Sequence, residues 1–408
     1  MRNRSLTLGY GRLNSLSCHN SLAIVVGDLS ADNYVGVLAS KLKQIMPNLN
    51  IFGVGGPKME ASGVNLIANC KELSVIGIFE TLNLIPRLIK LRQQIIEQIA
   101  VLKPKLVLLV DFSGFNLILA KAIKQKFPNL PIYYFISPQI WGSRPWRINT
   151  IAQTIDKMFV IFPFEVDLYQ SHNIPVKFVG HPLLTKIQNQ HFSKTEFCTK
   201  YKLDPHKPII AIFPGSRSLE IKNILPLLFS AISELSKTST DIQFVLSKAN
   251  DYLTEKINKI INESVAKESL LSKITFIDSS DNYCLFNACD LVWAKSGTTT
   301  LEAALFKKPM IIFYRGSWLS YIFYLLFRQT KLVGLPNILY SDYIIPELMQ
   351  HKFSVKNIID DTYDILNLTT VRTEMITNLE SIVAKLGEGN YLDGLIPDII
   401  AKYETLVS

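Results

Sequence analysis

The chain has 408 residues, of which 48% are apolar and 19% charged; this composition excludes an intrinsically disordered protein, and the length favours two folded domains. Its 43 basic and 34 acidic residues give a formal net charge of +9. The basic residues form no block and match no zinc-finger or RNA-binding motif. We therefore expect an anionic partner, either a phosphate substrate or a membrane surface, and no nucleic acid.

Cysteine and histidine spacing gives no sign of a metal site. The five cysteines are scattered, and their odd number indicates a reducing compartment without a disulfide framework. No two histidines have the His-x-x-x-His spacing, so we predict no metal and no other cofactor. Residues 1–21 contain three arginines, several serines and no acid, and lack the apolar core of a signal peptide. We expect an unstructured extension there, with a transit-like leader as the alternative.

The first half of the chain alternates strands with helices. We expect strands near residues 21–27, 50–54, 106–110, 132–136, 157–162 and 177–179, and helices near 33–45, 84–100 and 117–127. The run Leu106-Val-Leu-Leu-Val110 is apolar without alternation, which is typical of a strand buried on both faces of a parallel sheet. Residues 22–182 are therefore predicted to form one doubly wound α/β domain.

Asp111 follows that buried strand directly. Ligands of open α/β sheets gather beyond the carboxyl ends of the strands, so Asp111 is a candidate catalytic carboxylate. The alternative is a structural carboxylate that caps the helix expected near Leu117. A second unusual segment is Ser137-Pro-Gln-Ile-Trp-Gly-Ser-Arg-Pro-Trp-Arg147, because two tryptophans, two prolines and two arginines are more than a simple connector needs.

The second half repeats the α/β pattern. Residues 183–206 are polar and mixed in composition, and we expect a linker there. Strands are then expected at residues 208–213, 242–246, 274–277, 290–294 and 310–313, with helices between them. We predict a second α/β domain over residues 207–385, facing the first across a cleft, and a C-terminal helix over residues 386–408 that packs back on the first domain.

Two strand-to-helix turns of the second half have the composition of phosphate sites. In Phe213-Pro-Gly-Ser-Arg217, the helix-start N–H groups, Ser216 and the Arg217 guanidinium would form a diphosphate cradle; the alternative is a Pro-Gly turn with a solvent-facing arginine. Ser296-Gly-Thr-Thr-Thr-Leu-Glu302 repeats the arrangement. Its Glu302 either completes a capping box with Thr299 or accepts the hydroxyls of a ribose.

Three later features carry weaker signals. Asn337 offers an amide for base or phosphate recognition, or is a turn asparagine. Residues 345–350 are expected to start a helix, because Pro and Glu occupy its first turn. Residues 318–327 are almost entirely apolar and flanked by cations. A buried core helix is the alternative there, and we favour an interfacial membrane anchor, since the ten residues are too few to span a bilayer.

Together these motifs resemble the lipid-A-disaccharide synthase family over residues 22–400. The motifs that occur in the order seen in that family are Gly27-Asp-Leu-Ser-Ala-Asp32, Gly53-Val-Gly-Gly-Pro-Lys-Met59, Ile76-Gly-Ile-Phe-Glu80, Asp111-Phe-Ser-Gly-Phe-Asn116, Ser137-Pro-Gln-Ile-Trp141, Phe162-Pro-Phe-Glu165, Gly180-His181, Pro214-Gly-Ser-Arg217, Ser296 to Glu302, Pro309-Met310, Tyr314-Arg315 and Leu335-Pro-Asn337.

The resemblance implies an inverting, metal-independent glycosyltransferase with two Rossmann-like domains in the GT-B arrangement. It would move 2,3-diacylglucosamine from a UDP carrier onto 2,3-diacylglucosamine 1-phosphate. It also implies a peripheral protein on the cytoplasmic face of the inner membrane, able to form a homodimer. The alternatives are another GT-B nucleotide-sugar enzyme and a diverged relative that binds UDP-sugars or acyl lipids without turnover.

Site residues follow from the resemblance position by position. Asp111 would be the general base, and Arg217 would stabilise the leaving diphosphate. Residues implied to bind the UDP donor are Gly215, Ser216, Arg217, Ser296, Gly297, Thr298, Thr299, Glu302, Tyr314, Asn337 and Gln350. Residues implied to bind the acceptor and its lipid chains are Asp28, Asp32, Glu80, Ser137, Gln139 and Trp141, and those expected at the membrane are Trp318, Tyr321 and Phe327. The chain departs from the family in having Asp28 in place of Glu and Gly114 in place of a second Asp near the base.

Overall fold

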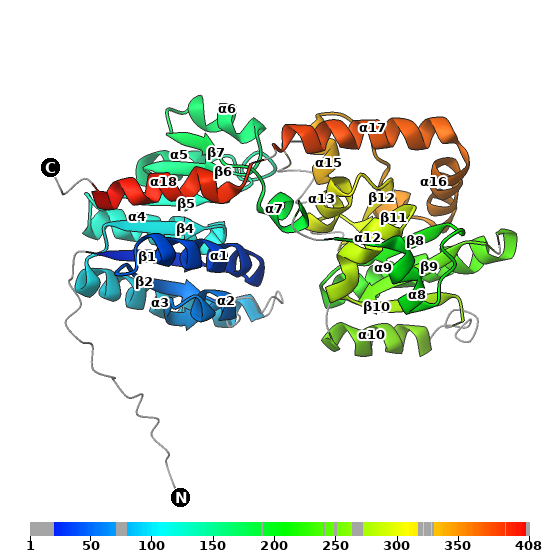
Figure 1. Cartoon of the computed structure of the whole chain (residues 1–408), viewed down its shortest axis with the longest axis horizontal. Helices are drawn as coiled ribbons and strands as arrows, with labels where there is room; N and C mark the ends of the chain where they lie inside the picture. The colour runs from blue at the N-terminus through cyan, green and yellow to red at the C-terminus, as the bar shows by residue number, and fades with distance from the viewer. Residues whose placement is uncertain are drawn as a thin grey trace, which may run out of the picture.

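The structure is a computed structural model that describes residues 20–70, 80–188, 191–239, 241–248, 251–262, 272–316, 321, 328, 330–387 and 389–404. Two α/β domains lie side by side in it, each with helices packed around one sheet (Figure 1). The strand order is β3-β2-β1-β4-β5-β6-β7 in the first sheet and β10-β9-β8-β11-β12-β13 in the second. Each recorded strand pairing is parallel, as the doubly wound pattern predicts.

The first domain alternates strands and helices almost throughout. Its elements are β1 (Ser21–Val26), α1 (Leu29–Ile45), β2 (Asn50–Gly55), α2 (Pro57–Ala61), β3 (Asn65–Asn69), α3 (Glu80–Leu102), β4 (Leu106–Val110), α4 (Ser113–Lys126), β5 (Ile132–Phe135), α5 (Arg147–Thr154), β6 (Lys157–Val160), α6 (Phe164–Gln170) and β7 (Val176–Phe178). Helices α7 (Pro182–Gln188) and α8 (Lys194–Tyr201) follow, so the segment predicted as a linker contains two helices.

The second domain repeats this organisation. Its elements are β8 (Ile209–Phe213), α9 (Ser218–Thr238), β9 (Gln243–Lys248), α10 (Asp251–Asn262), β10 (Ile274–Asp278), η2 (Ser279–Asp281), α12 (Asn282–Ala288), β11 (Leu291–Lys295), α13 (Thr298–Leu305), β12 (Met310–Tyr314), α15 (Leu335–Tyr340), β13 (Glu347–Met349), η3 (Gln350–Lys352), α16 (Val355–Asn367) and α17 (Thr369–Lys385), and α18 (Tyr391–Glu404) ends the chain.

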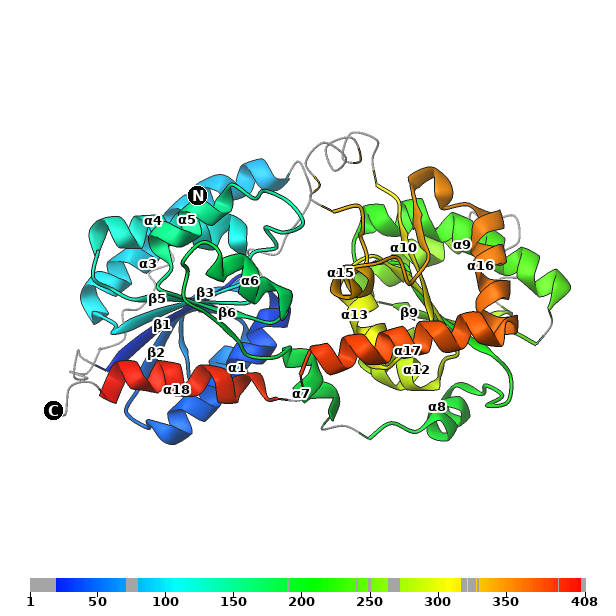
Figure 2. The same cartoon turned by 90° about the horizontal axis from the view of Figure 1, so that it is seen from above.

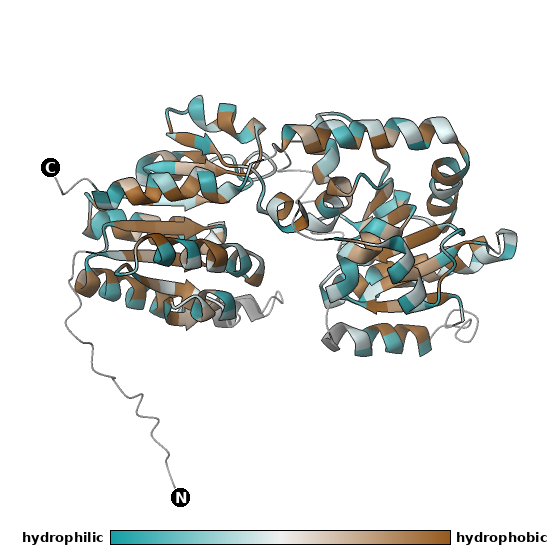
Figure 3. Ribbon diagram, viewed as in Figure 1, coloured by the Kyte–Doolittle hydropathy of each residue, from teal (hydrophilic) through white to brown (hydrophobic). Residues whose placement is uncertain are grey.

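Strand β4 is buried on both faces, which explains its unbroken apolar sequence. Leu106, Leu108 and Val110 pack in the cluster that contains residues of α1 and α18, whereas Val107 and Leu109 pack in a second cluster with α3 and α4. Successive strand side chains point to opposite faces, so one strand serves both cores. The strands of both sheets are correspondingly hydrophobic over most of their length (Figure 3).

The segment 345–350, in which a late helix was expected to begin, contains a short strand instead. Glu347 to Met349 form β13, which pairs in parallel with β12, and only the 3-10 turn η3 follows it. The Pro-Glu pattern fits a helix start locally. Pairing with the neighbouring strand decides the outcome, because three residues at a sheet edge carry too little periodicity to identify a strand from sequence.

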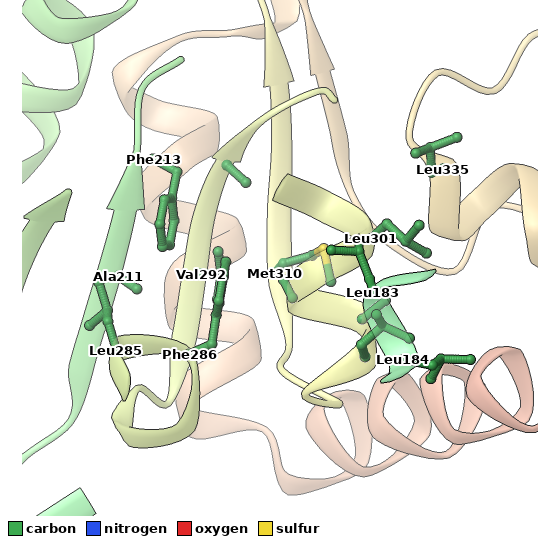
Figure 4. Packing of buried hydrophobic residues seen from close by; sticks show 14 of the residues in the cluster. Leu183, Leu184, Ala211, Phe213, Leu285, Phe286, Val292, Leu301, Met310 and Leu335 are labelled. Carbon is green, nitrogen blue, oxygen red and sulfur yellow. The ribbon is translucent and has the colours of Figure 1, made fainter. Parts of the chain in front are cut away.

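The two domains are connected through α7 and through the segment before α18. Leu183 and Leu184 of α7 belong to the same buried cluster as Leu301 and Leu335 of the second domain (Figure 4). Helix α18 then returns to lie along the first domain (Figures 1 and 2). There it covers the apolar face shared with α1, as its position in the buried cluster shows.

Polar contacts also fix α18 on the first domain. The Tyr403 hydroxyl donates a hydrogen bond to the carbonyl of Ser21 over 2.9 Å. The Asp398 carboxylate pairs with Lys157 and, at 2.8 Å, with Lys177. The last helix is therefore part of the first domain's core in space, although the second domain precedes it in the chain.

Candidate active site

A cleft of about 500 Å³ lies between the two domains, with walls from both. The first domain contributes the carboxyl ends of β1, β4 and β5, and the second contributes the start of α13. This is the edge at which open α/β sheets bind ligands. The predicted site residues that line the cleft are Asp28, Asp111, Ser137, Gln139, Thr298 and Glu302.

Asp111 is held in an uncommon backbone conformation. Asp111 and Phe112 both have φ of +47°, in the left-handed region that favours glycine. The Asp111 carbonyl accepts hydrogen bonds from the Tyr134 hydroxyl and, at 2.9 Å, from Asn116 Nδ2. Helix α4 begins at Ser113 without a side-chain cap, so Asp111 does not cap it. The carboxylate is thus available to the cleft, and such strain is characteristic of functional sites.

Asp28 lines the cleft together with Asp111. Asp28 also accepts the Ala31 N–H at 2.7 Å and so caps α1. Burial raises the pKa of the Asp111 carboxyl to about 6, and the charge of Asp28 acts in the same direction. A Cβ at Gly114 would have no atom within 4 Å. The second carboxylate near Asp111 therefore comes from Asp28, and position 114 is open space.

Buried Glu165 organises the loop after β5. Its carboxylate accepts hydrogen bonds from the Ser137 hydroxyl, from Trp141 Nε1 at 3.1 Å and from the Phe162 N–H at 3.2 Å. Burial raises the pKa of Glu165 to about 7, although these hydrogen bonds oppose the rise. Trp141 packs edge-on against Phe162 and does not line the cleft. Its role is to fix the loop that places Gln139 in the cleft.

A second cavity of about 350 Å³ lies at the starts of α9 and α13. The predicted donor-site residues that line it are Gly215, Ser216, Arg217, Ser296, Gly297, Thr298 and Thr299. Gly215 has φ of +116°, and a Cβ there would lie 2.6 Å from the Glu220 carboxylate, so only glycine fits this turn. Thr298 lines both cavities, which makes α13 the connection between them.

The Glu220 carboxylate binds the backbone N–H groups and the cations that line this second cavity. Its Oε2 accepts the backbone N–H groups of Ser216 and Arg217 at 3.2 and 3.3 Å. Its Oε1 lies 2.9 Å from Lys295 Nζ and 4.0 Å from the guanidinium of Arg217. The N–H groups predicted to hold a phosphate thus bind a carboxylate of the chain itself, in the capping box at the start of α9.

Glu302 faces the cleft from the second domain. Gly297 rather than Thr299 is the N-cap of α13, so the capping-box alternative is wrong. Glu302 accepts a hydrogen bond from the Tyr283 hydroxyl at 3.0 Å, and burial raises its pKa. Its charge in turn raises the pKa of Tyr34 on the opposite wall, after the larger effect of burial. Glu302 and Tyr34 therefore line the same cleft from different domains.

Several predicted ligand residues line neither cavity and have other partners. Asp32 is buried and accepts the N–H groups of Gly56, Lys58 and Met59, so it caps α2. The remaining predictions of direct contact concern Tyr314, Asn337 and Gln350. The ammonium of Lys295 lies over the ring of Tyr314. The side-chain amide of Asn337 forms hydrogen bonds with Glu347 and with the backbone of residues 344 and 345. The side-chain amide of Gln350 forms hydrogen bonds with the backbone of Gly316.

Four of the predicted lipid and membrane residues lie wholly or partly outside the described part of the chain, or at its edge. Trp318 and Phe327 lie outside the described residues. Glu80 begins α3, but its side chain is not among those described, and Tyr321 is described without its neighbours on either side. Among the described helices, none is both long and apolar enough to cross a bilayer.

Sequence comparison identifies the family. A sequence model of the family described as lipid-A-disaccharide synthetase matches residues 22–390. The chain is 38% identical over 334 residues to lipid-A-disaccharide synthase 1 of Legionella pneumophila (strain Lens), covering 81% of this chain and 84% of that protein. The chain belongs to the lipid-A-disaccharide synthase family. It is also 33% identical over 372 residues to the lipid-A-disaccharide synthase of Coxiella burnetii (strain RSA 331 / Henzerling II), covering 91% and 96%.

Solved structures show the same fold at lower identity. The UDP-GlcNAc 2-epimerase from Neisseria meningitidis bound to UDP-GlcNAc has a TM-score of 0.59 and 12% identity, covering 93% of this chain and all of that one. The predicted pair of Rossmann-like domains in the GT-B arrangement is confirmed, and membership of the family makes the chain a glycosyltransferase.

The site also contains family-motif residues to which sequence reasoning gave no role. Buried His181 lines the cleft, and burial lowers the pKa of its imidazole to about 3, so the ring is neutral. Leu183 N–H donates to its Nδ1 at 3.2 Å, which leaves the proton on Nε2. Lys295, Arg144 and Arg147 were missed as well. The density of arginines and tryptophans in residues 137–147 was the signal that could have identified the last two.

Proposed function

We propose that the protein is a lipid-A-disaccharide synthase that moves 2,3-diacylglucosamine from UDP onto 2,3-diacylglucosamine 1-phosphate. The observation that carries this proposal is the pair Asp111 and Asp28 in a cleft whose opposite wall is the start of α13. Family membership supports the sugar substrates. The site supports an inverting, metal-independent transfer.

In the proposed reaction, a hydroxyl of the acceptor attacks the anomeric carbon of the donor as the bond from that carbon to the UDP oxygen breaks. Asp111 accepts the hydroxyl proton, and the electron pair of the broken bond leaves with UDP. Attack opposite the leaving group inverts the anomeric configuration. A pKa near 6 suits this role, because the carboxylate is largely ionised at neutral pH yet is more basic than an ordinary aspartate.

The second cavity supplies the charges that a leaving diphosphate needs. Arg217, Lys295 and the N–H groups at the starts of α9 and α13 converge there. We infer that the diphosphate replaces the Glu220 carboxylate at the N–H groups of Ser216 and Arg217. These cations and dipoles perform the charge stabilisation for which other transferases use a metal.

The location of the acylated substrates suggests a peripheral protein at the cytoplasmic face of the inner membrane. The net charge of +9 supports attraction to an anionic surface. Contact of Trp318, Tyr321 and Phe327 with lipid, acceptor contact by Glu80 and formation of a homodimer remain predictions.

The proposal is tested with purified protein, the UDP-linked donor and the phosphorylated acceptor, following UDP release and disaccharide formation. Asp111→Asn keeps the side-chain shape and removes the base, so we expect kcat to fall about 10²- to 10⁴-fold with UDP affinity retained. Ionised Asp111 is destabilising above its raised pKa, so the variant should remain folded. Asp393→Asn, at an exposed carboxylate of α18, is the matched control.

Wild-type protein that binds UDP without forming the disaccharide would refute transfer and support the non-catalytic binder. An Asp111→Asn variant with normal kcat would remove Asp111 as the base. Product with retained anomeric configuration would contradict direct displacement.

A further inference from the structure

Two arginines line the cleft on the wall that carries Asp111. Arg144 lies in the loop after β5, and Arg147 is the first residue of α5. The Arg147 guanidinium donates a hydrogen bond to the Ser113 hydroxyl at 2.8 Å. Ser113 is two residues after Asp111 and also lines the cleft. Arg147 is thus hydrogen-bonded to the turn that carries the proposed base, and Arg144 lines the same cleft three residues earlier in the chain.

The loop that carries these arginines is fixed from behind. Glu165 holds it through Ser137 and Trp141, as described above. Arg144 itself has φ of +59°, a conformation that L residues adopt at a cost. A loop held in this way presents its guanidinium groups to the cleft with little further ordering on binding.

The charges of the two arginines are not balanced within the described part of the chain. Neither guanidinium has a carboxylate within ion-pair distance there. Burial and the neighbouring charge of Arg144 lower the pKa of Arg147, which shows that the two cations are close. Two adjacent guanidiniums beside a catalytic carboxylate provide the forked donors that suit a phosphate.

We propose that Arg144 and Arg147 bind the phosphate monoester of the acceptor sugar and so orient its hydroxyl toward Asp111. This inference rests on the proposed function, because that reaction supplies an acceptor with a phosphate. The donor diphosphate has a separate cradle in the second domain, with its own cations Arg217 and Lys295. The two arginines thereby select the phosphorylated acceptor over its dephosphorylated form.

The test compares 2,3-diacylglucosamine 1-phosphate with its dephosphorylated form in neutral detergent micelles free of phospholipid. We expect the wild-type protein to prefer the phosphorylated acceptor. Arg144→Gln and Arg147→Gln should each lower kcat/KM about 10- to 100-fold for that acceptor only, mainly through KM, because each removes a charged hydrogen-bond donor. The donor KM should not change, and Arg147→Lys should restore part of the preference.

Lys121→Gln is the matched control, because it removes one cation from the exposed surface of α4 outside the cleft. Equal losses on both acceptors, or a raised donor KM, would overturn the inference. Unchanged kinetics in phospholipid-free micelles would also overturn it, and would assign the arginines to a membrane headgroup if vesicle binding fell. Absence of product from the wild-type protein with either acceptor would instead refute the proposed function.

Discussion

Asp28 and Asp111 follow β1 and β4, and both carboxyl groups line the cleft. Burial of Asp111 is the larger cause of its raised pKa, and Asp28 adds to it. The Asp28 side chain, although one methylene shorter than that of Glu, therefore still acts on Asp111. Burial and the Asp28 charge together raise the pKa of Asp111 without a carboxylate at Gly114.

The pKa of Asp111 predicts how activity depends on pH. Only the ionised form can accept the acceptor proton, and its pKa is raised to about 6. We expect kcat/KM to level off above pH 7 and to fall about tenfold per pH unit well below pH 6. Initial rates of UDP release between pH 4.5 and 8.5, with substrates below their KM, measure the profile.

Glu165 provides the control for this profile, because its pKa of about 7 also lies in the range. Glu165→Gln keeps the size of the side chain and one oxygen that can accept from Ser137 and Trp141, but it cannot titrate. The inflection near pH 6 should persist in that variant. A flat profile down to pH 4.5, or an inflection lost with Glu165→Gln, would contradict assignment of the titration to Asp111.

A residue of the cleft was predictable where its position relative to a strand was enough to place it there. Asp111 was identifiable because it follows a buried strand directly. Asp32 was assigned to the acceptor because it belongs to a motif, yet it caps a helix that starts 25 residues later. The partners of Asn337 and Glu220 depend likewise on tertiary contacts. Sequence patterns identify polar groups near a site but not whether those groups face the ligand or support the backbone.

At the scale of elements, α18 is a helix of the first domain supplied by the end of the chain. Leu395 is fully buried in the cluster shared with α1 and the first sheet. Leu395→Ala should lower the free energy of unfolding by about 2–5 kcal/mol, because it leaves a cavity in that core. Denaturant unfolding gives the magnitude, and hydrogen exchange should locate the loss in β1 and β4 while β8 stays protected.

Asp393→Ala is the control for this prediction, because its side chain is exposed on the same helix. It should change stability by less than about 1 kcal/mol. Faster exchange confined to β8 and β11 in Leu395→Ala would show that α18 stabilises the second domain instead.

The long elements were predictable, whereas several of the short ones were not. Unbroken or periodic apolar runs identified β1, β4 and α9. Strand β13 has three residues and was mistaken for a helix, and α7 and α8 were missed inside a polar segment. These short elements are stabilised by neighbours distant in the sequence, so local pattern contains little information about them.

On the scale of the whole molecule, the cleft and the second cavity meet at Thr298. The first domain contributes Asp111, Arg144 and Arg147 to the cleft, and the second contributes Arg217 and Lys295 to the second cavity. Neither domain alone contains both halves of the proposed reaction. The continuous cluster through α7 keeps the halves together, because Leu183 and Leu184 pack with residues of the second domain (Figure 4).

The whole protein is expected to associate with an anionic membrane surface. Residues 318–327 combine aromatic and apolar side chains with flanking cations, as interfacial segments do. We expect the protein to bind vesicles containing anionic phospholipid, and less at high salt. Trp318→Ser with Phe327→Ser should weaken binding at least several-fold in a flotation assay, while kcat on detergent-dispersed substrates is retained.

Leu368→Ser, at an exposed apolar side chain elsewhere in the second domain, should not change binding. Loss of folding in the double variant would instead identify the segment as a buried core helix.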